Sequence, residues 1–106
     1  IRVRNDESLA EANRFSTPHI LLDSWSPAAY GGTGKTADWK MIGAFVAEHP
    51  EHRFVLAGGL NPSNVAEAIH VVRPAAVDVA GGVEESPGKK DPAKVRAFLQ
   101  AVRAAI

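Results

Sequence analysis

Residues 54–62 read FVLAGGLNP and hold, in order, an apolar run, a glycine turn and a helix start. A short, continuously apolar run is typical of a parallel strand that is buried on both faces. Asn61 followed by Pro62 is a typical helix start, with a capping side chain and proline at the first helical position. The stretch therefore predicts one strand–turn–helix unit of an α/β protein.

The 106 residues contain four such units in succession. Each apolar run is followed by a helical pattern, so the predicted order is β-α-β-α-β-α-β-α. Four right-handed βα units form either half of a (βα)8 barrel or a small open sheet, and their spacing does not decide between the two. The strands are expected at 1–3, 19–23, 53–57 and 75–79, and the helices at 5–15, 36–48, from the Asn61 cap to before Pro74, and from the Asp91 cap to 106.

Charge and composition exclude several classes of function. Acidic and basic residues balance at 12 each, so no net field attracts nucleic acid or an anionic membrane. No apolar run approaches the ~20 residues that span a bilayer. The chain has no cysteine and its histidines lack metal-ligand spacing, so neither a metal site nor a thiol nucleophile is expected. Because it starts at Ile1, in what resembles a strand remnant, we expect a segment of a longer chain.

Three glycine-rich segments follow the apolar runs. Repeated glycine turns at the carboxyl ends of strands are how an α/β barrel builds a phosphate site. A P-loop is rejected because Ala29 stands where its first glycine is required. The alternatives are tight turns that need positive φ and, for the first segment, a flexible connector. The candidate ligand-binding residues are Gly31, Gly32, Gly34 and Lys35 in the first segment, Gly58 and Gly59 in the second, and Gly81 and Gly82 in the third.

Two carboxylates lie at strand ends. Asp23 is the last residue of its strand, where barrel enzymes place catalytic groups, and is a candidate general acid or base. The alternative is a cap or an ion-paired carboxylate. Asp78 lies one residue before its strand end and faces either the site or a polar barrel layer. The charged residues 84–90 are interpreted as a solvated loop.

Taken together, these motifs resemble the phosphoribosylanthranilate isomerase family of tryptophan biosynthesis. The resemblance rests on LLDS at 21–24, GGTGKT at 31–36, LAGGLNP at 56–62, VDV at 77–79, GVE at 82–84 and PGKKD at 87–91. It implies an α/β fold in which residues 1–106 are the C-terminal (βα)4 half, units five to eight, of a single TIM (βα)8 barrel. The N-terminal half is then absent from this chain.

The family's reaction is an Amadori rearrangement of phosphoribosylanthranilate to the carboxyphenylamino-deoxyribulose phosphate, in the cytoplasm and without a cofactor. By resemblance, Asp23 is the general acid, the glycine turns bind phosphate, Asp78 shapes the floor near the anthranilate, and residues 31–35 close over the substrate. Two departures stand out. The family's base is a cysteine, which this chain lacks, and Ala80-Gly81-Gly82 replaces the usual Ser-Ser-Gly.

Two hypotheses of function follow. In the first, the chain is an isomerase segment that is inactive alone and works with its N-terminal half on a phosphoribosyl substrate. In the second, it is a non-catalytic phosphate-binding half-barrel or a structural interaction module. Unpaired strand edges and an exposed concave face predict that it pairs with the missing half or with a second copy of itself.

Overall fold

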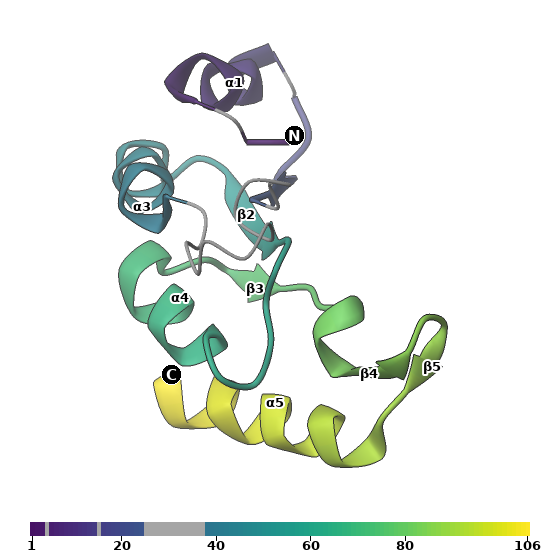
Figure 1. Ribbon diagram of the computed structural model, residues 1–106. Coiled ribbons are helices and arrows are strands. Elements are labelled where there is room, and N and C mark those ends of the chain that lie inside the picture. The colour runs from purple at the N-terminus through teal and green to yellow at the C-terminus, as the bar shows by residue number, and fades with distance from the viewer. Residues whose placement is uncertain (4, 15, 25–37) are drawn as a thin grey trace.

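The computed structural model describes residues 1–3, 5–14, 16–24 and 38–106 (Figure 1). Its centre is a parallel sheet with strands in chain order: β1 (His19–Asp23), β2 (Arg53–Ala57) and β3 (Ala76–Val77). Residues 1–3 run parallel to the end of β1, where Arg2 forms an isolated bridge to Asp23. Neighbouring parallel strands joined by helices are the βα pattern that the sequence predicts, and the bounds predicted for β1 and β2 are confirmed.

In the described part of the chain, helices pack along the sheet. They are α1 (Asp6–Ala10), continued by the 3₁₀ helix η1 (Glu11–Arg14), then α3 (Trp39–Glu48), α4 (Val65–Val72) and α5 (Pro92–Ala105). The Asp91 cap is confirmed, since its side chain accepts a hydrogen bond from Ala93 N at 2.9 Å. α3 begins later than predicted because Asp38 is not helical and caps it by accepting from Met41 N at 3.1 Å.

The third predicted helix also begins late. Residues 62–64 form a turn, and α4 starts at Val65. The Asn61 side chain accepts hydrogen bonds from Ser63 N at 2.8 Å and Asn64 N at 3.0 Å. Asn61 therefore caps a tight turn that leads into the helix, and the proline stands in that turn rather than in the helix.

The core lies on one face of the sheet. Side chains alternate along β1 and β2, with Ile20, Leu22, Phe54 and Leu56 buried. On the other face, Leu21 is 43% exposed. The prediction that these strands are buried on both faces is therefore wrong, because the described helices cover only one face of the sheet (Figure 1). The helices contribute Leu9, Ile42, Val65, Val72 and Phe98 to this core.

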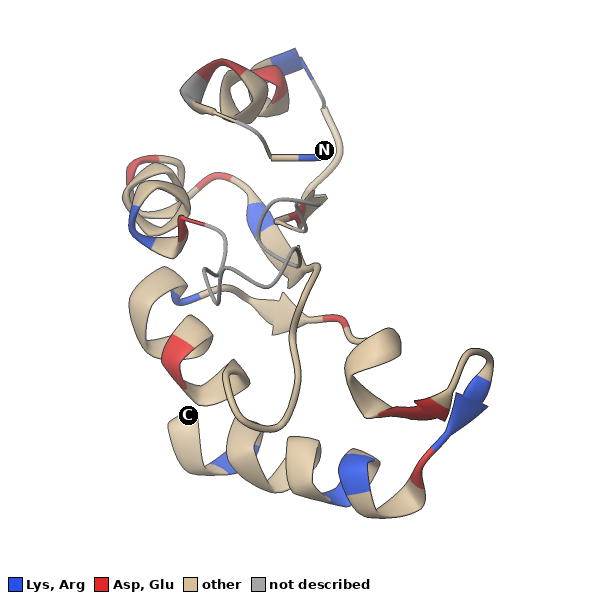
Figure 2. Cartoon of the chain, in the orientation of Figure 1, with Lys and Arg blue, Asp and Glu red and all other residues tan. Residues whose placement is uncertain are grey.

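The segment after β3 is more ordered than the predicted solvated loop. It contains the 3₁₀ helix η2 (Gly81–Val83) and an antiparallel pair, β4 (Glu84–Ser86) and β5 (Lys89–Lys90). Figure 2 shows acidic β4 facing basic β5. Lys89 Nζ lies 3.3 Å from Glu85 Oε1, and Lys90 Nζ lies 3.5 Å from Glu84 Oε2. The residues are mostly exposed, as predicted, but opposite charges and the Gly88 turn (φ 82°) order them as a hairpin.

Candidate functional site

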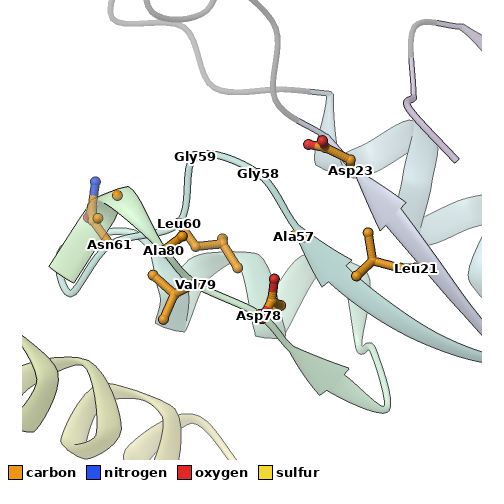
Figure 3. A pocket seen from close by; sticks show the side chains of 12 residues that line it. Leu21, Asp23, Ala57, Gly58, Gly59, Leu60, Asn61, Asp78, Val79 and Ala80 are labelled. Carbon is orange, nitrogen blue, oxygen red and sulfur yellow. The ribbon is translucent and has the colours of Figure 1, made fainter. Parts of the chain in front are cut away.

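A pocket of about 510 Å³ opens at the carboxyl ends of the three strands (Figure 3). Barrel and open α/β folds place their ligands at this end of the strands. The loops that follow β2 and β3 form most of its wall. The lining residues are Leu21, Asp23, residues 57–61 and residues 78–82.

Both predicted carboxylates line this pocket. The register pairs Asp23 with Ala57 on the neighbouring strand. Asp78 N donates to Leu56 O at 2.9 Å, which sets Asp78 beside the end of β2. Asp23 is half-buried and Asp78 is exposed. Asp23 and Asp78 thus line the same pocket (Figure 3).

The turn after β2 requires glycine at two successive positions. Gly58 has φ 92° and Gly59 has φ 71°, in the region that residues with a Cβ avoid. The interpretation as a tight turn with positive φ is thus correct for Gly58 and Gly59, which also line the pocket. It is wrong for Gly81 and Gly82, which lie in the 3₁₀ helix η2 without positive φ. A tight turn and a ligand-binding turn are compatible at Gly58 and Gly59, because a left-handed glycine turn exposes backbone atoms at the pocket wall.

Two side chains that the sequence analysis did not single out hold this turn. Ser24 is 1% exposed, and its Oγ lies 2.8 Å from Ala57 O and 3.2 Å from Gly58 O. Asn64 Nδ2 donates to Gly59 O at 2.9 Å, and Asn64 Oδ1 accepts from Asn61 N at 2.8 Å. Two sequence features could have predicted these bonds: Ser24 directly follows the strand end at Asp23, and Asn64 lies three residues after Asn61.

The loop after β3 is held by the hairpin. Lys90 Nζ donates to Ala80 O at 3.1 Å while it pairs with Glu84, and Lys94 Nζ donates to Glu84 O at 3.0 Å. Lys90 therefore connects the hairpin to the pocket loop. The sequence does not indicate this role, because the partner of Lys90 is a backbone carbonyl ten residues away.

The first glycine segment, with Gly31, Gly32, Gly34 and Lys35, lies outside the described residues. Among the residues that are described, no group of three histidine or acidic side chains is arranged to hold a metal ion. None of the helices in that same part of the chain has the length and apolar character needed to cross a bilayer.

Comparison with known proteins matches this chain to one family. Residues 1–101 match the family described as N-(5'phosphoribosyl)anthranilate (PRA) isomerase. The chain is 53% identical over 98 residues to N-(5'-phosphoribosyl)anthranilate isomerase of Geobacter sp. strain M21, covering 92% of this chain and 47% of that relative. The chain thus spans about half the length of the curated relatives it matches.

Solved structures agree with this match. Phosphoribosyl anthranilate isomerase from Thermotoga maritima superposes with a TM-score of 0.81 at 45% identity, over 98% of this chain and 49% of that one. A second isomerase structure, in complex with reduced 1-(o-carboxyphenylamino)-1-deoxyribulose 5-phosphate, gives 0.77 at 38% identity, over 98% and 46%.

Proposed function

This chain belongs to the N-(5'-phosphoribosyl)anthranilate isomerase family, and on that basis we propose that it supplies the acid and the phosphate site of that isomerase. In this proposal it is the C-terminal half of a (βα)8 barrel, units five to eight. One observation carries the proposal: Asp23 and the two described glycine turns line a single pocket. A general acid beside a phosphate-binding turn would suit a phosphorylated sugar whose ring oxygen is protonated as the ring opens.

Asp23 is the proposed general acid. Its carboxyl would protonate the ribose ring oxygen of phosphoribosylanthranilate as the ring opens to the Schiff base. The half-buried position at the end of β1 suits this role, because a partly desolvated group on a strand end is held in place yet reaches the pocket. Asp78, across Ala57, would shape the floor next to the anthranilate.

The phosphate would bind between the two glycine turns. Gly58 and Gly59 form one wall, and Gly81 and Gly82 form the other. Backbone N–H groups bind phosphate without side chains, so the site can work although Ala80-Gly81-Gly82 lacks hydroxyls. Residues 31–35 would close over the bound substrate, as the resemblance implies.

The second proton transfer needs a base that this chain does not hold. The family uses a cysteine, and the chain has none. That base would remove the C2′ proton of the opened sugar, giving the enol form of the aminoketose product. We therefore place it on an N-terminal half-barrel, which would cover the open face of the sheet. The 106-residue chain alone is expected to be inactive.

Reconstitution tests this proposal. The chain is mixed with the N-terminal half of the Geobacter sp. relative, and conversion of phosphoribosylanthranilate is measured. The matched control is the C-terminal half of that relative in the same mixture. We expect turnover from both mixtures and none from this chain alone.

Activity in the control without activity in the test mixture would favour the alternative, a non-catalytic phosphate-binding half-barrel or interaction module. Turnover by this chain alone that Asp23→Asn abolishes would contradict the need for a separate base.

A further inference from the structure

The two glycines at 58 and 59 do not by themselves fix the orientation of the peptide planes in this turn. Glycine adopts positive and negative φ with similar ease, so the two peptide planes after these residues can rotate at little cost. One orientation turns N–H groups toward the pocket and the other turns carbonyl oxygens toward it. A phosphate is attracted by the first arrangement and repelled by the second. Some other group must therefore select the orientation.

Two side chains outside the pocket wall contact the two carbonyl oxygens. Asn64 Nδ2 donates to Gly59 O at 2.9 Å. The single hydroxyl proton of Ser24 is shared between Ala57 O, at 2.8 Å from Oγ, and Gly58 O, at 3.2 Å. Neither Ser24 nor Asn64 lines the pocket, and Ser24 is almost fully buried. The two carbonyls thus bond to the protein interior and to the start of α4.

The N–H groups then have a defined direction. In a planar trans peptide the C=O and N–H bonds point to opposite sides. A bond to Gly58 O therefore directs the Gly59 N–H away from Ser24, and a bond to Gly59 O directs the Leu60 N–H away from Asn64. Among the described residues, neither N–H has a protein acceptor. Both residues line the pocket.

We propose that Ser24 and Asn64 are positioning residues that set the phosphate site by holding the carbonyls of Gly58 and Gly59 away from it. This inference rests on the proposed function for its ligand, while the orientation of the turn can be measured without one. Ser24 also connects the two parts of the pocket. It follows the acid Asp23 directly and bonds to the phosphate turn 34 residues away, so it fixes the acid and the turn relative to each other.

Asn64→Asp is the sharpest variant. An aspartate at 64 still accepts from Asn61 N, but it cannot donate to Gly59 O and repels it. Asn13→Asp is the matched control, because it adds the same negative charge at an exposed position of η1, away from the residues that line the pocket. Ser24→Ala removes the other bond without changing the charge.

The ¹⁵N-labelled chain is studied in the assembly state that it adopts in solution. Amide spectra report the Gly59 and Leu60 N–H groups, and inorganic phosphate is titrated at fixed ionic strength. We expect Asn64→Asp and Ser24→Ala to shift both amide signals. Each variant should also weaken the binding of phosphate about 10-fold, which corresponds to the loss of one hydrogen bond from an N–H group to the charged phosphate. Asn13→Asp should leave the two amide signals near those of the parent chain.

The proposal is overturned if Asn64→Asp leaves the two amide signals unchanged, or if Asn13→Asp moves them as much as Asn64→Asp does. A parent chain that binds no phosphate, but whose amide signals follow the expected pattern, supports the positioning role and counts against the proposed function. Ser24 is buried, so its variant can fail to fold. Asn64 is only half-buried, so the result for Asn64→Asp tests the proposal even if Ser24→Ala does not fold.

Discussion

A Cβ added to Gly82 would overlap the carbonyl oxygen of Leu60. The loop after β3 therefore packs its backbone directly against the turn after β2, and the two walls of the pocket support each other. Gly81 differs, since the nearest atom to a Cβ there is Glu84 Oε1 at 3.6 Å, an ordinary contact. Packing against Leu60 therefore requires glycine at position 82, whereas packing does not require it at position 81.

Gly82→Ala should destabilise the fold, and Gly81→Ala should not. The added methyl at 82 must displace backbone, and such overpacking costs about 1–3 kcal/mol. At position 81 we expect a change within about 0.5 kcal/mol. Urea unfolding of the two variants measures both values. Equal effects would show that the contact with Leu60 relaxes freely. Gly81 is also the better probe of phosphate binding, because its substitution does not disturb packing.

Asp23→Asn should lower kcat about 10²–10⁴-fold in the reconstituted enzyme, which is the usual contribution of a general acid. KM should change little, because the amide keeps the shape of the carboxyl but cannot deliver the proton. Steady-state kinetics separate the two constants. Glu67→Gln, on the exposed side of α4, is the control for loss of one negative charge. An unchanged kcat would remove Asp23 from the mechanism.

Leu21→Lys should weaken assembly of the chain. Leu21 lies on the sheet face that no described helix covers and is 43% exposed. An exposed apolar sheet face and open strand edges favour association with another chain. Leu99→Lys is matched in chemistry and exposure, at 48%, but lies on α5 away from the sheet. Sedimentation across a dilution series should show association for the parent chain and for Leu99→Lys, and less for Leu21→Lys. A well-folded parent monomer at every dilution would contradict this prediction.

Lys90→Ala should loosen the loop at Ala80. Its ammonium group bonds to Ala80 O and pairs with Glu84, and we expect a loss of about 1 kcal/mol in unfolding free energy. Lys89→Ala is the control in the same strand. Lys89 pairs with Glu85 in solvent, and such pairs contribute about 0.2–1 kcal/mol at most. Hydrogen exchange at Gly81 and Gly82 should rise only for Lys90→Ala. A rise in both variants would assign the effect to the hairpin as a whole.

Much of the fold was predictable because its signals are local. The apolar runs at 19–23 and 53–57 became β1 and β2 with the predicted bounds, and Asp91-Pro92 began α5 as predicted. Two helix starts were wrong because a neighbouring side chain offered a better cap, and the strand predicted at 75–79 is shorter, Ala76–Val77. Asp38 capped α3 in place of Thr36, and Asn61 capped a turn before α4. The apolar runs also did not reveal that one face of the sheet is uncovered, since burial depends on what packs against it.

The succession of strands and helices, the turn at Gly58 and Gly59, Asp23 at a strand end and the resemblance to the isomerase family could all be predicted from the sequence. These follow from patterns within a few residues, which short-range sterics and hydrogen bonding translate directly into backbone geometry. The contacts of Ser24 and Asn64 with the carbonyls of the Gly58–Gly59 turn, and the packing of Gly82 against Leu60, depend on the tertiary fold. The contacts of Ser24 and Gly82 join residues that are distant in sequence, and all of these groups meet only when the sheet aligns the ends of its strands.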